Sequence, residues 1–348
     1  MNKLGVLDDK SAYFLTDNSY RKYFSDVDND EGFLLKTLTQ TYYLADPRYF
    51  YALKQKLKSG KIIAVEYKSL ETVKNLLKDL VIEKLYIDFD TTTLTQFESY
   101  KDLGVQLLNG SKSLSQLRKS KSVKEIESIK KACKIASDAF EYILNFIKAG
   151  VTEKSIRNRL VRFMKSKGAS GESFDTIVAF GANSAVPHHE TGNARLKKDQ
   201  AVLIDFGCVV DGYCSDMTRT LYYGEPTKEF LEAFNLVSEA NLLGEKSAIE
   251  GVNAKDVDGV VRDFFAKYGV QDKFTHSLGH GIGLQIHEEP YLSKRGEGKL
   301  EENYVFSIEP GLYYDGEFGI RIENTVVIEK GKAKSLTGNG RDLIIIKE

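Results

Sequence analysis

Several patterns are scarce or absent in this sequence, and each absence excludes a class of protein. No stretch of the 348 residues approaches the roughly 20 consecutive apolar residues of a membrane-spanning helix. The first 18 residues carry charges where a secretory signal peptide needs an apolar core. The chain has 49 basic and 50 acidic residues, so no excess of positive charge predicts binding to nucleic acid or to an anionic membrane. We therefore expect a globular protein without nucleic-acid or membrane partners.

Cysteine is also scarce. The chain has only three cysteines, Cys133, Cys208 and Cys214, and they form no cluster of the kind that binds zinc through thiolates. In the hairpin described below, Cys208 and Cys214 point to opposite faces, so we expect them to pack as free thiols. Free thiols are typical of a reducing compartment, and we expect the protein to be cytoplasmic.

The first part of the chain alternates predicted strands and helices, so we expect a small α/β domain over residues 1–115. No glycine-rich phosphate loop follows any of its strands, which argues against nucleotide binding. Residues 109–122, rich in Ser and Lys, are interpreted as a connector. The predicted strands are a hairpin at 32–38 and 41–46, followed by a helix at Pro47, and two buried strands at 61–67 and 84–90.

Residues 116–348 form a predicted second domain with an internal repeat. Ser122 and Glu125 make a capping box before a long amphipathic helix that we expect to end at Gly150. Residues 150–168 can then be aligned with 251–269 at an offset of 101, sharing Gly, Val, Lys, Phe and Gly. Each stretch follows a long helix and precedes strands, which indicates two similar α/β halves. The apolar stripe of the long helix is Val123, Ile126, Ile129, Cys133, Ala136, Phe140, Ile143 and Ile147.

A predicted hairpin at residues 201–223 carries two aspartates in apolar surroundings. Asp211-Gly212 separates two runs rich in Val, Ile, Thr and Tyr, which is a strong signal for a two-residue turn. With that turn, Asp205 faces Thr218, and Asp205 and Asp216 become diagonal neighbours on one face of the sheet. Two like charges in an apolar setting repel each other, so either one is protonated or a cation lies between them.

Histidine has a narrow distribution in the chain. All five histidines fall between residues 188 and 287, in the segments "NSAVPHHE" and "THSLGHGIGLQIHEEP". Two glutamates follow in strand-like surroundings, Glu309 in "VFSIEPGLYY" and Glu323 in "GIRIENTVVIE". Taken singly, a histidine beside a Gly-rich turn or a glutamate in a strand is more often structural than functional. Together they predict Asp, Asp, His, Glu and Glu around metal, and oxygen-rich ligation with one imidazole suits Mn, Co or Zn.

The order and spacing of these residues resemble the pita-bread metallopeptidases, which include methionine aminopeptidase, prolidase and aminopeptidase P. The matching segments are "SDMTRT", "GHGIG", "EPG" and "RIE", with no departure at a ligand position. The segment "TYYLADPRYF" resembles the N-terminal domain of the proline-specific branch, a domain that methionine aminopeptidases lack. The resemblance implies a creatinase-like N-terminal α/β domain and a C-terminal pita-bread domain with two pseudo-symmetric halves.

The resemblance also implies a role for each residue of the site. Asp205 would bind one metal ion, His280 and Glu309 the other, and Asp216 and Glu323 would bridge the two. His188 and His287 would contact the substrate and stabilise its oxyanion, and Glu309 would also transfer protons. Arg321 would anchor the substrate or orient carboxylates, whereas His189 and His276 are interpreted as structural or as supporting the residues that bind metal and substrate. We expect two divalent ions per chain, most simply manganese, with cobalt or zinc as alternatives.

The implied function is an exopeptidase that cleaves between a free N-terminal residue and a following proline, in a homodimer. Aminopeptidase P is the first choice, and prolidase, which acts on dipeptides, is the alternative. A non-catalytic pita-bread binding module is disfavoured because all five ligands are present, and a metal-free enzyme of the creatinase type is disfavoured for the same reason.

Overall fold

The computed structural model describes residues 7–27, 31–57 and 60–347, and the first six residues of the charged N-terminus lie outside them. The chain divides into two compact units, Met1–Arg118 and Lys119–Glu348. The sequence placed this boundary between residues 115 and 116. Within the described ranges, no helix combines the length and the apolar character needed to cross a bilayer.

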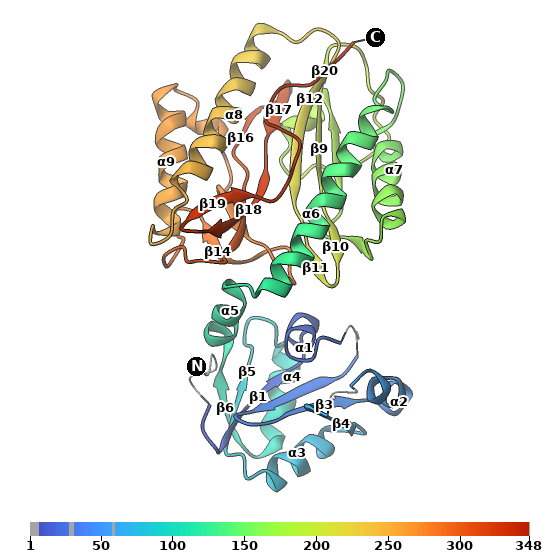
Figure 1. The fold of residues 1–348 in the computed structure, drawn as a ribbon, viewed down its shortest axis with the longest axis vertical. Helices are drawn as coiled ribbons and strands as arrows, with labels where there is room; N and C mark the ends of the chain where they lie inside the picture. The colour runs from blue at the N-terminus through green and yellow to red at the C-terminus, as the bar shows by residue number, and fades with distance from the viewer. Residues whose placement is uncertain (1–6, 28–30, 58–59, 348) are drawn as a thin grey trace. The chain divides into compact units, whose positions relative to one another are not determined.

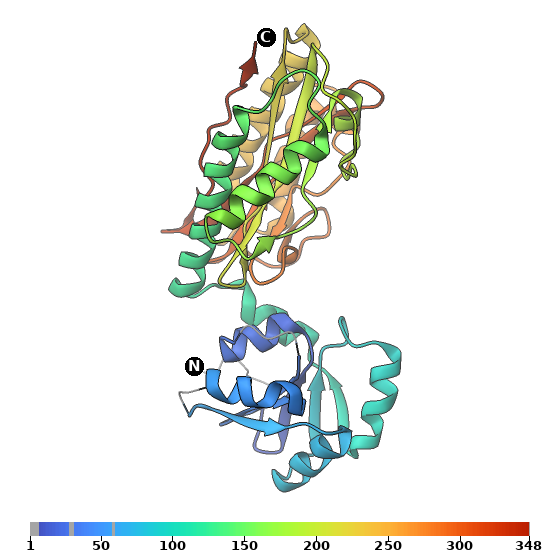
Figure 2. The same cartoon turned by 90° about the vertical axis from the view of Figure 1, so that its right-hand side faces the viewer.

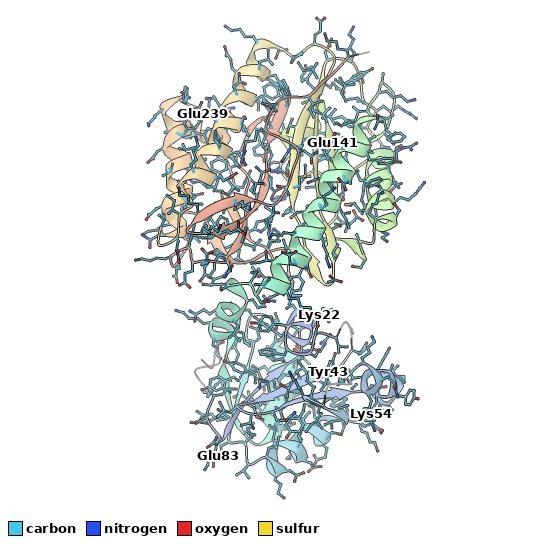
Figure 3. All side chains as sticks on the ribbon, viewed as in Figure 1. Lys22, Tyr43, Lys54, Glu83, Glu141 and Glu239 are labelled. Carbon is cyan, nitrogen blue, oxygen red and sulfur yellow. The ribbon has the colours of Figure 1, made fainter. Side chains whose placement is uncertain are left out.

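The first unit is built on one mixed sheet in the order β4-β3-β2-β1-β5-β6 (Figure 1). The predicted hairpin is present as antiparallel β2 and β3, and Asp46 caps the helix that begins at Pro47. Tyr43, labelled in Figure 3, is fully buried in this unit. Its elements are β1 (Ser11–Leu15), α1 (Asn18–Ser25), β2 (Phe33–Thr37), β3 (Thr41–Ala45), α2 (Pro47–Lys56), β4 (Ile62–Glu66), α3 (Leu70–Asp79), β5 (Lys84–Ile87), α4 (Leu94–Tyr100), β6 (Gln106–Asn109) and α5 (Ser111–Lys119).

Two expectations for this part of the chain were wrong. Strand β4 was expected to be buried, but it is an edge strand, and the side chain of Ile63 is 43% exposed. The Ser/Lys-rich connector contains helix α5, because the Asn109 side chain accepts a hydrogen bond from the backbone N–H of Ser111 and Leu114 and Leu117 are buried. A composition typical of loops therefore did not prevent a helix that buries two leucines one turn apart.

The second unit has two groups of strands, each covered by a pair of helices, as the proposed halves require (Figures 1 and 2). Helices α6 and α7 pack on the sheet β20-β12-β9-β8, and α8 and α9 pack on the sheet β14-β13-β15-β18-β19. Glu141 on α6 and Glu239 on α8, labelled in Figure 3, lie on exposed faces of these helices. The helices are α6 (Val123–Leu144), α7 (Glu153–Ser166), α8 (Lys228–Ser247) and α9 (Ala254–Lys267).

The strands of the second unit belong either to the sheets of the two halves or to two smaller sheets, β11-β10-β7 and β16-β17. They are β7 (Gly171–Glu172), β8 (Ile177–Phe180), β9 (Gln200–Phe206), β10 (Cys208–Val210), β11 (Tyr213–Cys214), β12 (Met217–Tyr223), β13 (Gly279–Gly281), β14 (Glu288–Leu292), β15 (Val305–Ile308), β16 (Gly311–Tyr314), β17 (Phe318–Arg321), β18 (Asn324–Glu329), β19 (Lys332–Ser335) and β20 (Ile345–Ile346).

The internal repeat is confirmed in detail. Helices α7 and α9 begin and end at positions related by the predicted offset of 101, and both are 14 residues long. Each is preceded by a glycine with positive φ, Gly150 at 82° and Gly251 at 87°. The backbone N–H groups of these glycines donate to the carbonyls of Leu196 and Leu300, so the turns that lead into both helices are anchored in the same way.

The long helix α6 starts as predicted and ends earlier. The capping box of Ser122 and Glu125 is present. The helix ends at Leu144 rather than Gly150, and turns connect it to α7. Val123, expected on the apolar stripe, is 78% exposed because it is the first residue of the helix.

The aspartate hairpin has the predicted register. Val210 pairs with Tyr213 across the Asp211-Gly212 turn, and Thr218 pairs with Asp205. Both turn residues have positive φ, 54° and 86°, as a type I′ turn requires. The three cysteines are buried free thiols, and burial raises the pKa of Cys208 to about 11.

Glycine at position 207 allows the hairpin to pass between its two sheets. A Cβ atom there would collide with the carbonyl oxygen of Ser215, which is backbone and cannot rotate away. Replacing Gly207 by Ala should therefore lower the free energy of unfolding by about 2–3 kcal/mol, the usual scale of overpacking, as measured by urea denaturation.

Gly171→Ala in β7 is the matched control, because a Cβ there meets nothing within 4 Å. It should change stability by less than about 0.5 kcal/mol. Equal midpoints for the two variants would show that the hairpin can shift to accommodate the methyl group.

Candidate metal centre

One large pocket of about 750 Å³ in the second unit collects the chemistry-bearing residues. All five residues predicted as metal ligands line it, although the first and the last of them are more than 100 residues apart in the sequence. His188, His287 and Arg321 line the same pocket, as do His189 and His276, which were interpreted as structural or supporting. The predicted ligands are Asp205, Asp216, His280, Glu309 and Glu323.

The elements of the two halves position these ligands. Asp205 is in β9 and Asp216 directly precedes β12, so the hairpin supplies both aspartates. His280 is the central residue of β13. Glu309 follows β15 and Glu323 precedes β18, at the breaks where these strands end and begin. The first half thus contributes two carboxylates, and the second half two carboxylates and an imidazole.

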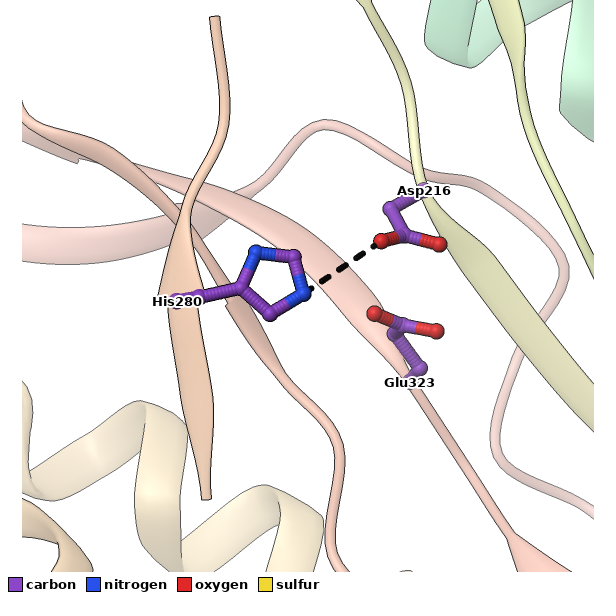
Figure 4. A group of neighbouring side chains, drawn as sticks. All are labelled: Asp216, His280 and Glu323. Carbon is purple, nitrogen blue, oxygen red and sulfur yellow. Dashed lines mark ion pairs between the residues drawn. The ribbon is translucent and has the colours of Figure 1, made fainter. Parts of the chain in front are cut away.

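Asp216, His280 and Glu323 form the tightest group (Figure 4). One ligand atom from each lies within 4.8 Å of the others, and all three residues are buried. The Nε2 atom of His280 is 3.6 Å from Oδ2 of Asp216 and 3.3 Å from Oε1 of Glu309. Carboxylate oxygens and an imidazole nitrogen converging at this range form a donor set suited to a divalent metal ion.

Two buried carboxylate oxygens in this group support the binding of a cation. Oδ2 of Asp205 accepts a hydrogen bond from Arg321, and Oε2 of Glu323 accepts one from Thr218 at 2.7 Å. Their other oxygens, Oδ1 of Asp205 and Oε1 of Glu323, are buried without a hydrogen-bond partner among the described residues. A buried acceptor without a donor is costly, and a metal ion would satisfy both atoms. The residues present therefore fit a metal.

The protonation of these groups in the metal-free protein reflects crowding of like charge. Burial, together with the charges of Glu323 and Asp205, raises the pKa of Asp216 well above its usual range. Burial and the charges of Glu309 and Asp205 do the same to the pKa of Glu323. Burial also raises the pKa of Asp205, although the adjacent Arg321 opposes the shift.

Glu309 behaves differently because a histidine lies beside it. Burial alone would raise the pKa of Glu309, but the hydrogen bond and positive charge of His280 hold it at about 2. In return, burial would lower the pKa of His280, and the Glu309 carboxylate raises it above its ordinary value. In the absence of metal, these two residues form an ion pair inside the cluster.

Arg321 contacts the carboxylate of Asp205 rather than that of Glu323, which is only two residues further along the chain. Its Nη2 lies 2.5 Å from Oδ2 of Asp205, and its Nη1 lies 2.6 Å from the hydroxyl of Tyr313. Tyr313 in turn lies 2.8 Å from Nε2 of His276. The contact with Asp205 is of the kind that the predicted carboxylate-orienting role of Arg321 requires.

Some residues that line the pocket or contact its lining were not identified from the sequence. Tyr313 links Arg321 to His276, but nothing in "GLYY" distinguishes it from a core tyrosine. Phe174, Ile177, Ile286 and Tyr291 give the pocket apolar walls. Most of them lie in loops or at strand ends. There the spacing of apolar residues in the sequence does not indicate which way a side chain points.

The first prediction for this centre concerns the effect of its crowded carboxylates on the stability of the metal-free protein. In the presence of a chelator, Asp216→Asn should raise the free energy of unfolding on the order of 1–2 kcal/mol, because it removes a carboxyl group whose ionised form this buried cluster disfavours. The check is urea denaturation at neutral pH, beside the exposed control Asp263→Asn, which should change little. A less stable Asp216→Asn protein would mean that the cluster is already neutralised by its protein partners.

Comparisons with known proteins agree with the geometry. Residues 127–330 match the model of metallopeptidase family M24, and residues 8–120 match the creatinase/prolidase N-terminal domain. The chain is 35% identical to the Xaa-Pro dipeptidase of Pyrococcus furiosus over 320 residues, covering 91% of this chain and 88% of that one.

Solved structures show the same similarity. An Xaa-Pro dipeptidase from Bacillus anthracis superposes with a TM-score of 0.92 at 34% identity, covering 96% of this chain and 95% of that one. An X-Pro aminopeptidase from Thermotoga maritima superposes with a TM-score of 0.91 at 33% identity, covering 98% and 96%. Both architectures predicted from the sequence, the creatinase-like domain and the pita-bread domain, are thereby confirmed.

Proposed function

The chain belongs to metallopeptidase family M24, and we propose that it is an Xaa-Pro aminopeptidase, which removes the first residue of a peptide whose second residue is proline. Membership confirms the family predicted from the sequence and makes the protein a metal-dependent hydrolase of peptides. The names of its relatives, among them dipeptidases and an aminopeptidase, support a proline-specific substrate. The choice between these two activities depends on the pocket.

We propose that the five predicted ligands hold two divalent ions. Four carboxylates carry the charge that balances two such ions, and the orphaned oxygens of Asp205 and Glu323 support cations on both sides of the group. Asp205 would hold one ion, His280 and Glu309 the other, and Asp216 and Glu323 would bridge them. When bound, such a pair polarises a carbonyl and lowers the pKa of water to near neutrality. Manganese suits this oxygen-rich set, and the resemblance supports a homodimer.

The residues around the ligands would bind and orient the peptide. His188 and His287 line the pocket, and the ring centroid of His287 is 4.2 Å from that of His280. Burial lowers the pKa of His287, so its neutral ring is available to donate one hydrogen bond to the developing oxyanion. Glu309 lies at the wall of the same pocket, where it would receive and return a proton.

The second residue of the substrate presents a particular problem. A proline nitrogen makes the scissile bond a tertiary amide, without an N–H for the enzyme to hold. The ring must therefore be recognised by shape and by apolar contact. The aromatic and aliphatic walls at Phe174, Ile177, Ile286 and Tyr291 supply such contact. The free amine of the first residue would dock against the acidic cluster, which fixes cleavage one residue from the end.

We choose aminopeptidase over dipeptidase because the positively charged side chains of the pocket already pair with carboxylates of the protein. An Xaa-Pro dipeptide ends in a carboxylate directly after the ring, so an enzyme dedicated to dipeptides needs a cation there. Among the described lining residues the only Lys or Arg side chains are Arg157 and Arg321. Arg157 pairs with Glu172 at 3.0 Å and Asp175 at 3.2 Å, and Arg321 pairs with Asp205. A longer peptide makes no such demand.

Xaa-Pro dipeptidase is the second candidate. It is favoured by the activity for which relatives are named, including the enzymes of Pyrococcus furiosus and Bacillus anthracis. In that case the histidines of the pocket would have to bind the carboxylate, since both arginines are occupied.

Substrate length tests the proposal directly. A tetrapeptide Xaa-Pro-Yaa-Zaa should be hydrolysed with a kcat/KM at least about tenfold above that of the dipeptide Xaa-Pro, because only the dipeptide places an unpaired carboxylate in the pocket. Rates with defined divalent metals, followed by release of the free first residue, give the comparison.

The controls are an N-acetylated tetrapeptide and an Xaa-Ala peptide of the same length. Both should be poor substrates, because one lacks the amine and the other the ring. Cleavage of the dipeptide alone would identify a dipeptidase, and equal cleavage of the Xaa-Ala peptide would refute proline specificity.

Two further variants separate metal binding from substrate binding. Asp216→Asn should lose bound metal and activity together, because a bridging charge is gone. His287→Ala should keep about two ions per chain by elemental analysis and lower kcat by about 10²–10³, the scale for one oxyanion donor. Loss of metal in His287→Ala would assign that residue to the ligands instead.

A further inference from the structure

A buried carboxylate lies outside the predicted ligand set. Glu153, the first residue of α7, has no exposed surface. The described residues offer it no lysine or arginine partner, and its one ion-pair contact is with His189. A buried carboxylate in such a place is stable only if donors surround it, and the helix N-terminus adds a favourable dipole.

Four hydrogen bonds surround Glu153. Oε1 accepts from the backbone N–H of Phe180 at 3.0 Å and from the amide nitrogen of Asn183 at 2.8 Å. Oε2 lies 3.0 Å from both Nε2 of His189 and the backbone N–H of Gly192. The four donors are distributed along residues 180–192, which we call the histidine loop. One carboxylate thus holds the loop at both ends and at two points between them.

The histidine loop carries His188 into the pocket. His188 is exposed, lines the pocket, and makes no hydrogen bond to another described residue through its own ring. Its two neighbours in the chain are held instead. The carbonyl oxygen of Pro187 accepts from Nη1 of Arg321 at 3.3 Å, and the ring of His189 is bonded to Glu153. The position of His188 therefore depends on the contacts of the residues on either side of it.

We propose that Glu153 is a positioning residue for His188 and acts through His189. Because the Glu153 oxygen is an acceptor, Nε2 of His189 carries the proton, and the ring cannot flip without breaking this bond. The fixed ring and the three other bonds give the loop one conformation, in which His188 faces the substrate. The proposal rests on the proposed function, since it takes His188 to be a substrate contact.

Glu153→Gln is the central test because it keeps the size of the side chain. The amide would present a donor to the N–H of Gly192 or to Asn183, so at least one of the four bonds is lost. The kcat/KM on the preferred peptide should fall about 10–100-fold, the scale of a small misplacement in an active site, with metal content unchanged. In a His188→Ala background the same substitution should cost less than about threefold, because the group that it positions is absent.

The matched control is Asp88→Asn, a buried carboxylate in the first unit that accepts from Ser111 at 2.7 Å. It removes a buried charge without touching the pocket and should leave kcat/KM unchanged. His189→Gln, which keeps a donor for Glu153, should retain more activity than His189→Ala. This comparison of the two His189 variants tests the same contact even if the Glu153→Gln protein folds poorly.

Histidine ¹⁵N NMR of the metal-free protein reports the environment of the His188 and His189 rings without any substrate. In Glu153→Gln the signals of both His188 and His189 should move, whereas Asp88→Asn should move neither. If wild type cleaves no Xaa-Pro peptide but the signals move together, the proposed function fails while the contact survives. An unmoved His188 signal, or an equal loss of kcat/KM in both backgrounds, would overturn the positioning role.

Discussion

The crowding of like charge in an interior is the constraint on which the rest of this structure depends. Asp205, Asp216 and Glu323 are each less than a tenth exposed, and of these three carboxylates Arg321 forms an ion pair with Asp205. Such an arrangement is unfavourable without a cation. The surrounding sheets and helices can hold it because two well-packed cores offset the cost. The centre is therefore a place where stability is given up for the ability to bind metal.

The pseudo-symmetric halves explain how such a centre is assembled. Each half supplies a two-layer unit of helices on strands, and three of the five predicted ligands, Asp216, Glu309 and Glu323, lie directly beside a strand end. The Thr218–Glu323 and Arg321–Asp205 contacts both join a residue of the first half to one of the second. The ligand geometry is thus defined by the packing of one half on the other, and neither half contains a complete set.

Much of this could be predicted from the sequence, for identifiable reasons. The hairpin register followed from Asp211-Gly212, because a two-residue turn fixes the partner of every residue in the strands. The repeat was visible because both copies need glycine at the same positions before and after the helix. The failures have reasons as well. Helix α5 was hidden by a Ser/Lys-rich composition, and the end of α6 by a glycine that lies beyond the true terminus.

The walls of the pocket could not be derived in the same way. Side chains such as Phe174 and Tyr291 occupy positions where backbone direction is set by long-range packing rather than by local period. Glu153 gave no signal either, since an acidic residue in the first turn of a helix is ordinarily explained by the helix dipole alone. Its burial, and the four donors around it, exist only after segments far apart in the sequence have come together.

The Arg321–Asp205 contact has a consequence for the order in which this protein can mature. During synthesis the aspartate hairpin is made well before Arg321, the residue that pairs with Asp205 and lies more than 100 positions after it in the sequence. Until then the nascent hairpin must keep its carboxylates in water or protonated, so its apolar strands cannot be fully sequestered. The ion pair of Asp205 therefore forms only once the second half has been made, and the same holds for the pairing of β20 with β12 in the sheet of the first half.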